Sequence, residues 1–307
     1  MSIRALLSLP CQSKVQTMTQ RFIPAFRAFP LICGLLIYVA TPGRVLAEPS
    51  PAAVTAFNSY VQAVESRLAQ QHRSQAAFLA PLSPVQQSDT RLRRGEIIVE
   101  QRTPSGGLVL PGALLHHWRA TAFVPGAGTD YFARLLKNVD AYPLDFSPQV
   151  LQARVLMRDG DRLEAWMRVR QHHVITVEMD TTYDVNFGKL DAQHGYSISR
   201  STHISELDSE GHAVDASQDH GFLWRQNTYW SYEERDGGLY IQVESVSLTR
   251  SIPTGLGWVV GPFIESVPRQ SLEFTLRAAC SALHKRVNQE AKDLRSKQPK
   301  ETERNQG

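Results

Sequence analysis

Apolar residues recur at helical spacing near the start of the region 48–94. The positions lie three or four residues apart: Val54, Phe57, Tyr60, Val61, Val64 and Leu68. This spacing predicts an amphipathic helix that ends at about Gln71. Pro81 and Pro84 break the pattern that follows. We therefore expect residues 48–94 to form one helix and a linker.

From Glu96 onward, short alternating or continuous apolar runs replace the helical spacing and predict strands. The expected strands are 97–99, 108–110, 116–124, 150–158, 162–170, 174–187, 196–207, 222–235 and 239–250, with one short helix from about 129 to 139. Asp159-Gly160-Asp161 and Asp236-Gly237-Gly238 are typical hairpin turns. The later strands are therefore expected to pair antiparallel, each with the next.

A second, longer helix is expected after the last strand. Its apolar stripe consists of Leu272, Leu276, Ala279, Leu283 and Val287. Pro268 suits a first helical turn, so the helix is predicted over about 268–290. Residues 292–307 are polar and charged, and we expect a disordered tail there.

Three segments carry a resemblance to a known family: 131–142 (YFARLLKNVDAY), 228–234 (TYWSYEE) and 251–258 (SIPTGLGW). With the order of elements, they make the stretch 116–283 resemble the START-like (SRPBCC) superfamily, and the last block is similar to secreted bacterial members without an assigned function. The resemblance implies an α+β helix-grip fold over 95–291. In that fold a curved antiparallel sheet wraps around a long C-terminal helix. The helix at 54–71 would be an addition at the N-terminus.

The resemblance also implies a cavity between sheet and helix, which other members use for lipids, sterols, polyketides or hormones. A sheet bent around one helix has more inner surface than the helix covers, so a pocket is a natural consequence of the shape. We expect an exported protein that binds an apolar, lipid-like ligand. One alternative, less favoured, is a cyclase- or hydrolase-type enzyme on the same fold with Glu244 or a cavity histidine as its acid–base group. The other is an envelope structural or interaction domain with a filled core.

The first 47 residues carry the excess of positive charge in this chain. They hold five basic residues and no acidic one, an apolar run from Phe29 to Ala40, and small residues at Val45-Leu46-Ala47. This is the pattern of a signal peptide, with Met18 as an alternative start and an uncleaved anchor as the alternative interpretation. We expect export to the periplasm or the medium.

Without residues 1–47, 28 Lys plus Arg remain against 30 Asp plus Glu. The mature chain is then slightly acidic, so we expect no nucleic-acid partner. Of the three cysteines only Cys280 lies beyond residue 47, which excludes an internal disulfide; we interpret it as a small buried apolar residue rather than a nucleophile.

Ten histidines raise the question of a metal site. His116-His117 and His172-His173 are adjacent pairs, whose rings point to opposite faces of a strand. No H-E-x-x-H or C-x-x-C motif occurs, and Gly255-Leu256-Gly257 lacks the rest of a dinucleotide motif. Ser199, Ser201, His203 and Ser205 alternate along one strand and are expected on an outward polar face. We expect no metal and no cofactor.

The candidate ligand-binding residues lie on the last two strands: Trp224, Trp230, Tyr232, Glu244 and Arg250. The aromatic rings would form apolar walls, and the two charged groups would fix a polar end of the ligand. Gly255 to Gly261 would act as a lid. In the alternative interpretation this is an ordinary surface strand, in which Val246 and Leu248 pack on a neighbour. The expected partner is an apolar small molecule or lipid, with transient membrane contact; the sequence predicts no particular protein partner.

Overall fold

The computed structural model describes residues 48–82, 84–172, 176–215, 219–251 and 257–297. The predicted signal peptide at 1–47 therefore lies outside the described residues. The helices are α2 (Pro51–Gln71), α3 (Val85–Arg93), α4 (Thr129–Lys137), the 3-10 turn η1 (Val139–Ala141), α5 (Tyr142–Asp145) and α6 (Gly257–Lys297). The strands are β1 (Ile98–Gln101), β2 (Leu108–Leu110), β3 (Ala113–Pro125), β4 (Val150–Asp159), β5 (Arg162–His172), β6 (Thr176–Lys189), β7 (His194–Glu206), β8 (Arg225–Arg235) and β9 (Gly238–Arg250).

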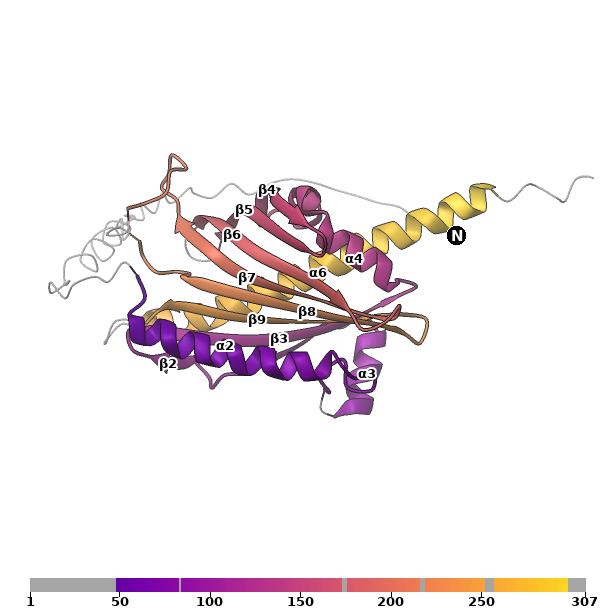
Figure 1. Cartoon of the computed structure of the whole chain (residues 1–307), viewed down its shortest axis with the longest axis horizontal. Helices are drawn as coiled ribbons and strands as arrows, with labels where there is room; N and C mark the ends of the chain where they lie inside the picture. The colour runs from indigo at the N-terminus through magenta and orange to yellow at the C-terminus, as the bar shows by residue number, and fades with distance from the viewer. Residues whose placement is uncertain (1–47, 83, 173–175, 216–218, 252–256, 298–307) are drawn as a thin grey trace, which may run out of the picture. The chain divides into compact units, whose positions relative to one another are not determined.

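Within the described residues, nine antiparallel strands form one sheet in the order β1-β3-β9-β8-β7-β6-β5-β4, with β2 paired to β3. Each strand from β4 to β9 pairs with the next. Figure 1 shows α2 in front of this sheet and α6 behind it. The predicted α+β helix-grip architecture, with an extra N-terminal helix, is therefore confirmed.

The β8–β9 hairpin decides which side chains face which helix. Asp236 and Gly237 both have positive φ, 55° and 76°, as a two-residue type I′ turn requires. This turn aligns Tyr229 with Glu244 and Trp230 with Val243. Directly opposite residues point to the same face, so Trp230 and Val243 share one face while Tyr229 and Glu244 share the other.

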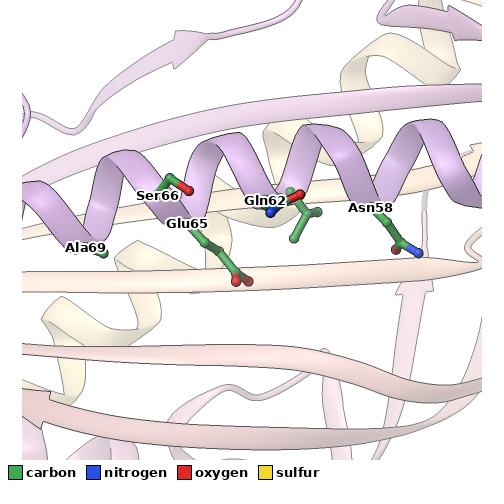
Figure 2. A pocket seen from close by; sticks show the side chains of 6 residues that line it. Asn58, Gln62, Glu65, Ser66 and Ala69 are labelled. Carbon is green, nitrogen blue, oxygen red and sulfur yellow. The ribbon is translucent and has the colours of Figure 1, made fainter.

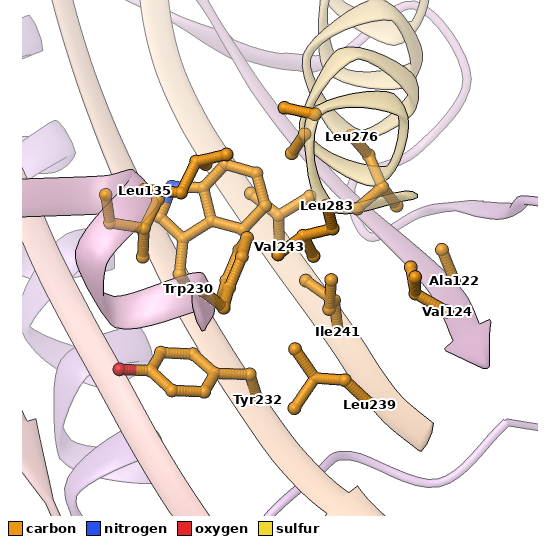
Figure 3. Close-up of a cluster of buried hydrophobic side chains, with 14 of the residues drawn as sticks. Ala122, Val124, Leu135, Trp230, Tyr232, Leu239, Ile241, Val243, Leu276 and Leu283 are labelled. Carbon is orange, nitrogen blue, oxygen red and sulfur yellow. The ribbon is translucent and has the colours of Figure 1, made fainter. Parts of the chain in front are cut away.

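The face toward α6 holds the larger hydrophobic core. Trp230 and Tyr232 of β8 and alternate residues of β9 pack against α4 and against Leu276 and Leu283 of α6 (Figure 3). The Phe132 ring of α4 meets the Trp230 ring edge-on, with the centroids 5.3 Å apart. The stripe predicted from the sequence is thus the face of α6 that packs on the sheet.

The opposite face is covered by α2. The helix begins after Ser50, whose hydroxyl accepts a hydrogen bond from the Ala53 backbone N–H at 3.1 Å, with Pro51 as its first residue. Its apolar stripe, including Phe57 and Val64, packs on Leu115, Val246, Leu248 and their neighbours. Both faces of β9 are consequently buried.

Three expectations from the sequence need correction. The linker after α2 contains a further helix, α3, which docks Leu92 against Phe123 and Tyr240. Helix α6 begins at Gly257 and continues to Lys297, so 257–261 is helical rather than a lid and 292–297 is not part of a tail. Residues 252–256 and 298–307 lie outside the described residues. Among the described helices, none has the length and apolar character needed to cross a membrane.

Candidate functional site

A cavity of about 170 Å³ lies between α6 and the inner side of strands β4 to β8. The helices α4, η1 and α5 contribute to its wall, and η1 and α5 lie against β4. The apolar part of its lining comes from Leu136, Val139, Tyr142, Phe146, Val150, Leu163, Ala165, Met167, Val169, Met179, Tyr183, Val185, Phe187, Leu223, Trp230 and Phe274. The polar part comes from Gln149, Gln171, Ser197, Ser199, Gln226, Thr228, Ser271 and Thr275.

Strict alternation along β5 and β6 builds the apolar wall. Leu163, Ala165, Met167 and Val169 of β5 all line the cavity. The residues that alternate with them point outward. There, arginines of β5 pair with carboxylates of β6: Arg162 with Asp184 at 2.9 Å, Arg168 with Asp180 at 2.8 Å, and Arg170 with Glu178 at 2.7 Å. The period of two therefore places the charges of this hairpin outside the cavity.

The described lining contains no charged residue and no histidine. Its titratable groups are Tyr142 and Tyr183. Burial raises the pKa of Tyr183 to about 12 and the pKa of Tyr142 further above its ordinary value. The Tyr142 hydroxyl also donates to the Leu136 carbonyl at 2.7 Å. Neither phenol ionises at neutral pH, so the described lining supplies no acid–base pair of the kind that enzymes place in such a site.

Neutral polar groups lie on two walls of the cavity. On one wall, the Gln171 amide donates to the Ser271 hydroxyl at 3.0 Å, and the Thr275 hydroxyl donates to the Ser271 carbonyl at 2.9 Å. On the other wall are Ser197 and Ser199 of β7 and Thr228 of β8, with Ser199 directly opposite Thr228. These groups suit hydrogen bonds to a ligand rather than proton transfer.

The serine row of β7 was expected on an outward face, and that expectation was wrong for its first half. A register shift at Thr182/Tyr183 inserts one extra residue into β7. Ser199 pairs with Val185 of the cavity wall, whereas His203, beyond the shift, pairs with Thr182 and is exposed. A β-bulge thus turns one end of the row inward and the other outward.

Of the five candidate ligand-binding residues, Trp230 lines the cavity. Tyr232 lies on the same face but packs in the solid core, with its ring centroid 4.9 Å from that of Phe132. Its ring also fills the space above Gly195, where any Cβ would collide with it. Trp230 therefore lies at the cavity, whereas Tyr232 is part of the packed core.

Glu244 does not face the cavity, so it cannot fix a polar end of a ligand there. It is 2% exposed and lies beneath α2, where its Oε2 accepts from Arg67 at 2.6 Å and contacts His117 Nε2 at 2.8 Å. Burial acts to raise the pKa of Glu244, but the His117 hydrogen bond and the Arg67 charge outweigh it and lower that pKa to about 2. The buried charge that the sequence left without a partner is paired by the N-terminal helix.

Arg250 and Trp224 also lie away from the cavity. The Arg250 guanidinium donates to the Asp219 carbonyl at 2.9 Å and lies 5.8 Å from the centre of the Trp224 ring. Trp224 packs with α2 and the outer face of β9. The expected arrangement of aromatic walls with the pair Glu244 and Arg250 is therefore divided between two faces of the sheet.

Sequence reasoning missed the polar network that continues from Glu244. The Tyr60 hydroxyl lies 3.0 Å from His117 Nδ1, so Tyr60, His117, Glu244 and Arg67 form one chain of contacts under α2. Burial lowers the pKa of His117, and the hydrogen bond to Glu244 opposes this. The sequence signal for this network was the spacing of Tyr60 and Arg67, which are seven residues, or two helical turns, apart and therefore share one face of α2.

A second hollow runs along the flank of α2 and is open to solvent. Figure 2 shows its lining: Asn58, Val61, Gln62, Glu65, Ser66 and Ala69. Glu65 is already engaged, because it accepts two hydrogen bonds from Arg200 at 2.7 Å and one from Tyr229 at 3.1 Å. The groove is a shallow hollow open to solvent, and we assign it no function.

Two other candidate chemistries find no support in the described residues. No group of three or more His, Cys, Asp or Glu side chains there is placed to hold a metal ion. Cys280 packs against the α6 core, and burial raises its thiol pKa to about 12, which suppresses the reactive thiolate.

No protein-family model matches the chain, and a search of curated proteins gave no match. Among solved structures, the chain is similar to a STAR-related lipid transfer protein from Xanthomonas axonopodis, at 16% identity and a TM-score of 0.43, over 61% of this chain and 93% of that one. It is similar to the Zhui aromatase/cyclase from Streptomyces sp. R1128, at 14% identity and a TM-score of 0.42, over 56% and 96% of the two chains. Human STARD10 shares 10% identity at a TM-score of 0.41, over 73% and 88%.

These similarities are remote. The START-like helix-grip fold expected from the sequence is confirmed by the topology described above: six consecutive antiparallel strands, followed by one long helix on the inner face of the sheet.

Proposed function

We propose that this chain is an exported START-like protein that binds a small apolar ligand in the cavity between α6 and strands β4 to β8. One observation carries the proposal: a partly open cavity of about 170 Å³ lies between sheet and helix, and its described lining is mainly apolar and free of charge. The export part is supported by the basic, acid-free and short-apolar pattern of residues 1–47.

A cavity of this size suits a compact ligand. Apolar cavities of roughly 150 Å³ stay dry and bind benzene. The Trp230 ring offers a large apolar surface on one wall and is itself held by contact with Phe132. The binding energy would therefore come from burial of the ligand rather than from charge.

The proposal is tested by filling the cavity. Ala165 is 2% exposed and lines it, so Ala165→Phe should occupy the space from the β5 wall. Glu164→Phe is the matched control, because it adds the same ring to the neighbouring outward position. Native mass spectrometry of protein from its natural host should show a retained small molecule in wild type and in Glu164→Phe, but not in Ala165→Phe.

A wild-type protein that carries no small molecule, and that binds none of a panel of benzene-sized apolar compounds in calorimetry, would contradict the proposal. The export part is tested separately: the N-terminus of the exported protein should lie at Glu48 or within a few residues of it. Full-length protein recovered only from the cytoplasm would contradict export.

A further inference from the structure

We propose that the cavity selects neutral ligands with one hydrogen-bonding group and rejects the charged counterparts of the same shape. This inference rests on the proposed function and names the chemical class of the ligand. It concerns the cavity's own residues, and three observations carry it: the placement of charge, the placement of hydroxyl groups, and the volume.

The first observation is that no described lining residue offers a counter-ion. The ion pairs of β5 and β6 lie on the outer face of the sheet, as the arginine–carboxylate pairs above show. The buried charge of Glu244 lies beneath α2, also on the outer face, and is paired there. A carboxylate or ammonium buried against this lining would lose part of its hydration without gaining a charged partner, which opposes binding.

The second observation is a group of hydroxyls on one wall. Ser197, Ser199 and Thr228 line the cavity from adjacent strands, and Ser197 is 2% exposed. Within the described residues, no hydrogen bond involves any of these three hydroxyls. A hydroxyl both donates and accepts, so the wall can satisfy a ligand hydroxyl or carbonyl equally well.

On the opposite wall, formed by β5 and α6, the hydroxyl groups are already hydrogen-bonded within the protein. The Ser271 hydroxyl already accepts from Gln171, and the Thr275 hydroxyl already donates to the Ser271 carbonyl. The remaining lining near these groups includes Phe274 and Met167, which offer apolar surface. The ligand is therefore oriented, with its polar group toward β7 and β8 and its apolar body toward β5 and α6.

The third observation limits the size. At about 170 Å³ the cavity is slightly larger than one that holds benzene. A single ring or a short chain with one hydroxyl or carbonyl fits this volume, and an intact two-chain lipid does not.

The test uses four probes with the same ring: toluene, benzyl alcohol, benzoate and benzylamine, titrated calorimetrically at pH 7. We expect benzyl alcohol to bind at least about tenfold more tightly than benzoate or benzylammonium, because an unpaired charge resists burial. Thr228→Val and Ser199→Ala should lower the affinity for benzyl alcohol by about fivefold each and leave toluene unchanged.

A charge introduced into the wall gives a second readout. Met167→Lys places an ammonium group on the lining, and should reverse the order so that benzoate binds best. Glu164→Lys is the matched control on the outer face of the same strand and should keep the wild-type order.

The outcomes separate this inference from the proposed function. If toluene binds and benzoate binds as tightly as benzyl alcohol, the inference is wrong and the cavity is still a ligand site. If the hydroxyl variants leave benzyl alcohol unchanged, the inference is also wrong. If no probe binds to wild type, the proposed function fails with it.

Discussion

At the scale of single residues, the buried charge of Glu244 belongs to the attachment of α2 and does not line the cavity. Glu244 is held by Arg67 and His117, and its second oxygen, Oε1, is buried without a partner among the described residues. Removing one member of a buried pair leaves the other uncompensated, whereas removing an exposed charge costs little. The Arg67 side chain is 38% exposed, so its contribution is moderated by solvent.

Arg67→Met should therefore lower the free energy of unfolding by about 1–3 kcal/mol. Chemical denaturation at neutral pH measures this change. Arg73→Met, at an exposed position just beyond the same helix, should change stability by less than about 0.5 kcal/mol. Benzyl alcohol affinity should stay the same in both variants, because neither side chain lines the cavity; a loss of affinity in Arg67→Met would contradict the assignment of Glu244 to a structural role.

Buried histidines make stability depend on pH. Burial lowers the pKa of His72 to about 4, and the same cause lowers that of His116 to about 4. The His72 ring stacks on Tyr196 at 4.1 Å, and its Nε2 lies 2.8 Å from the Ser231 hydroxyl. In the unfolded chain the imidazole titrates near 6.5, so between about pH 6.5 and 4 the unfolded state binds the extra proton. Stability is complete above 6.5 and is lost as the pH falls toward 4.

His72→Gln keeps a hydrogen-bonding side chain but removes this titration. Between pH 7 and 4.5, wild type should lose about 2 kcal/mol more unfolding free energy than His72→Gln. Urea unfolding at the two pH values measures the difference. Using the difference between two proteins removes the effect of groups that titrate in the opposite sense, such as Asp219, whose pKa burial raises to about 6. Parallel pH profiles for the two proteins would show that His72 is not held neutral.

At the scale of elements, α2 acts as a cover for the outer face of the sheet. Phe57 is 3% exposed and packs with residues of β3 and β9. Phe57→Ala should cost about 3–5 kcal/mol, the usual loss for a large buried ring. Asn58→Ala, on the exposed side of the same turn, is the matched control and should be nearly neutral. A small loss in Phe57→Ala, measured by thermal and chemical unfolding, would mean that α2 is only loosely attached.

Most elements were predictable from the sequence because their patterns are local. The spacing of Phe57, Val61 and Val64 predicted α2, and Asp236-Gly237 predicted the β8–β9 turn. Helix α3 was missed because seven of its nine residues are polar or charged, which leaves no apolar stripe to recognise. The bulge in β7 was missed because one inserted residue leaves no mark on composition.

The candidate site was only partly predictable, for a different reason. Alternation along β9 shows that Glu244 and Val243 face opposite sides, but not which side meets the long helix. A sheet that is covered on one side only normally shows which side that is, because its other face is polar. Here α2 buries the second face as well, so Val246 and Leu248 look like inner residues although they lie under α2.

At the scale of the whole sheet, the cavity follows from the number of strands. Eight strands in a row at about 4.8 Å spacing span roughly 34 Å, about three times the diameter of one helix. Helix α6 lies over β3 and β9, where the core is solid. The inner side of β4 to β8 faces residues of α4, η1, α5 and α6, and the space between these helices and the strands is the cavity.

The central claim is that the ligand binds on the α6 face of the sheet and not among the charged residues under α2. Two tryptophans report on the two faces: Trp230 lines the cavity, and Trp224 packs on the α2 side. The probe is 4-bromobenzyl alcohol, whose bromine quenches the fluorescence of a tryptophan that it contacts. Titration with it should quench the tryptophan fluorescence of wild type and of Trp224→Phe equally, and should have much less effect on Trp230→Phe. Quenching that survives in Trp230→Phe and disappears in Trp224→Phe would contradict the account.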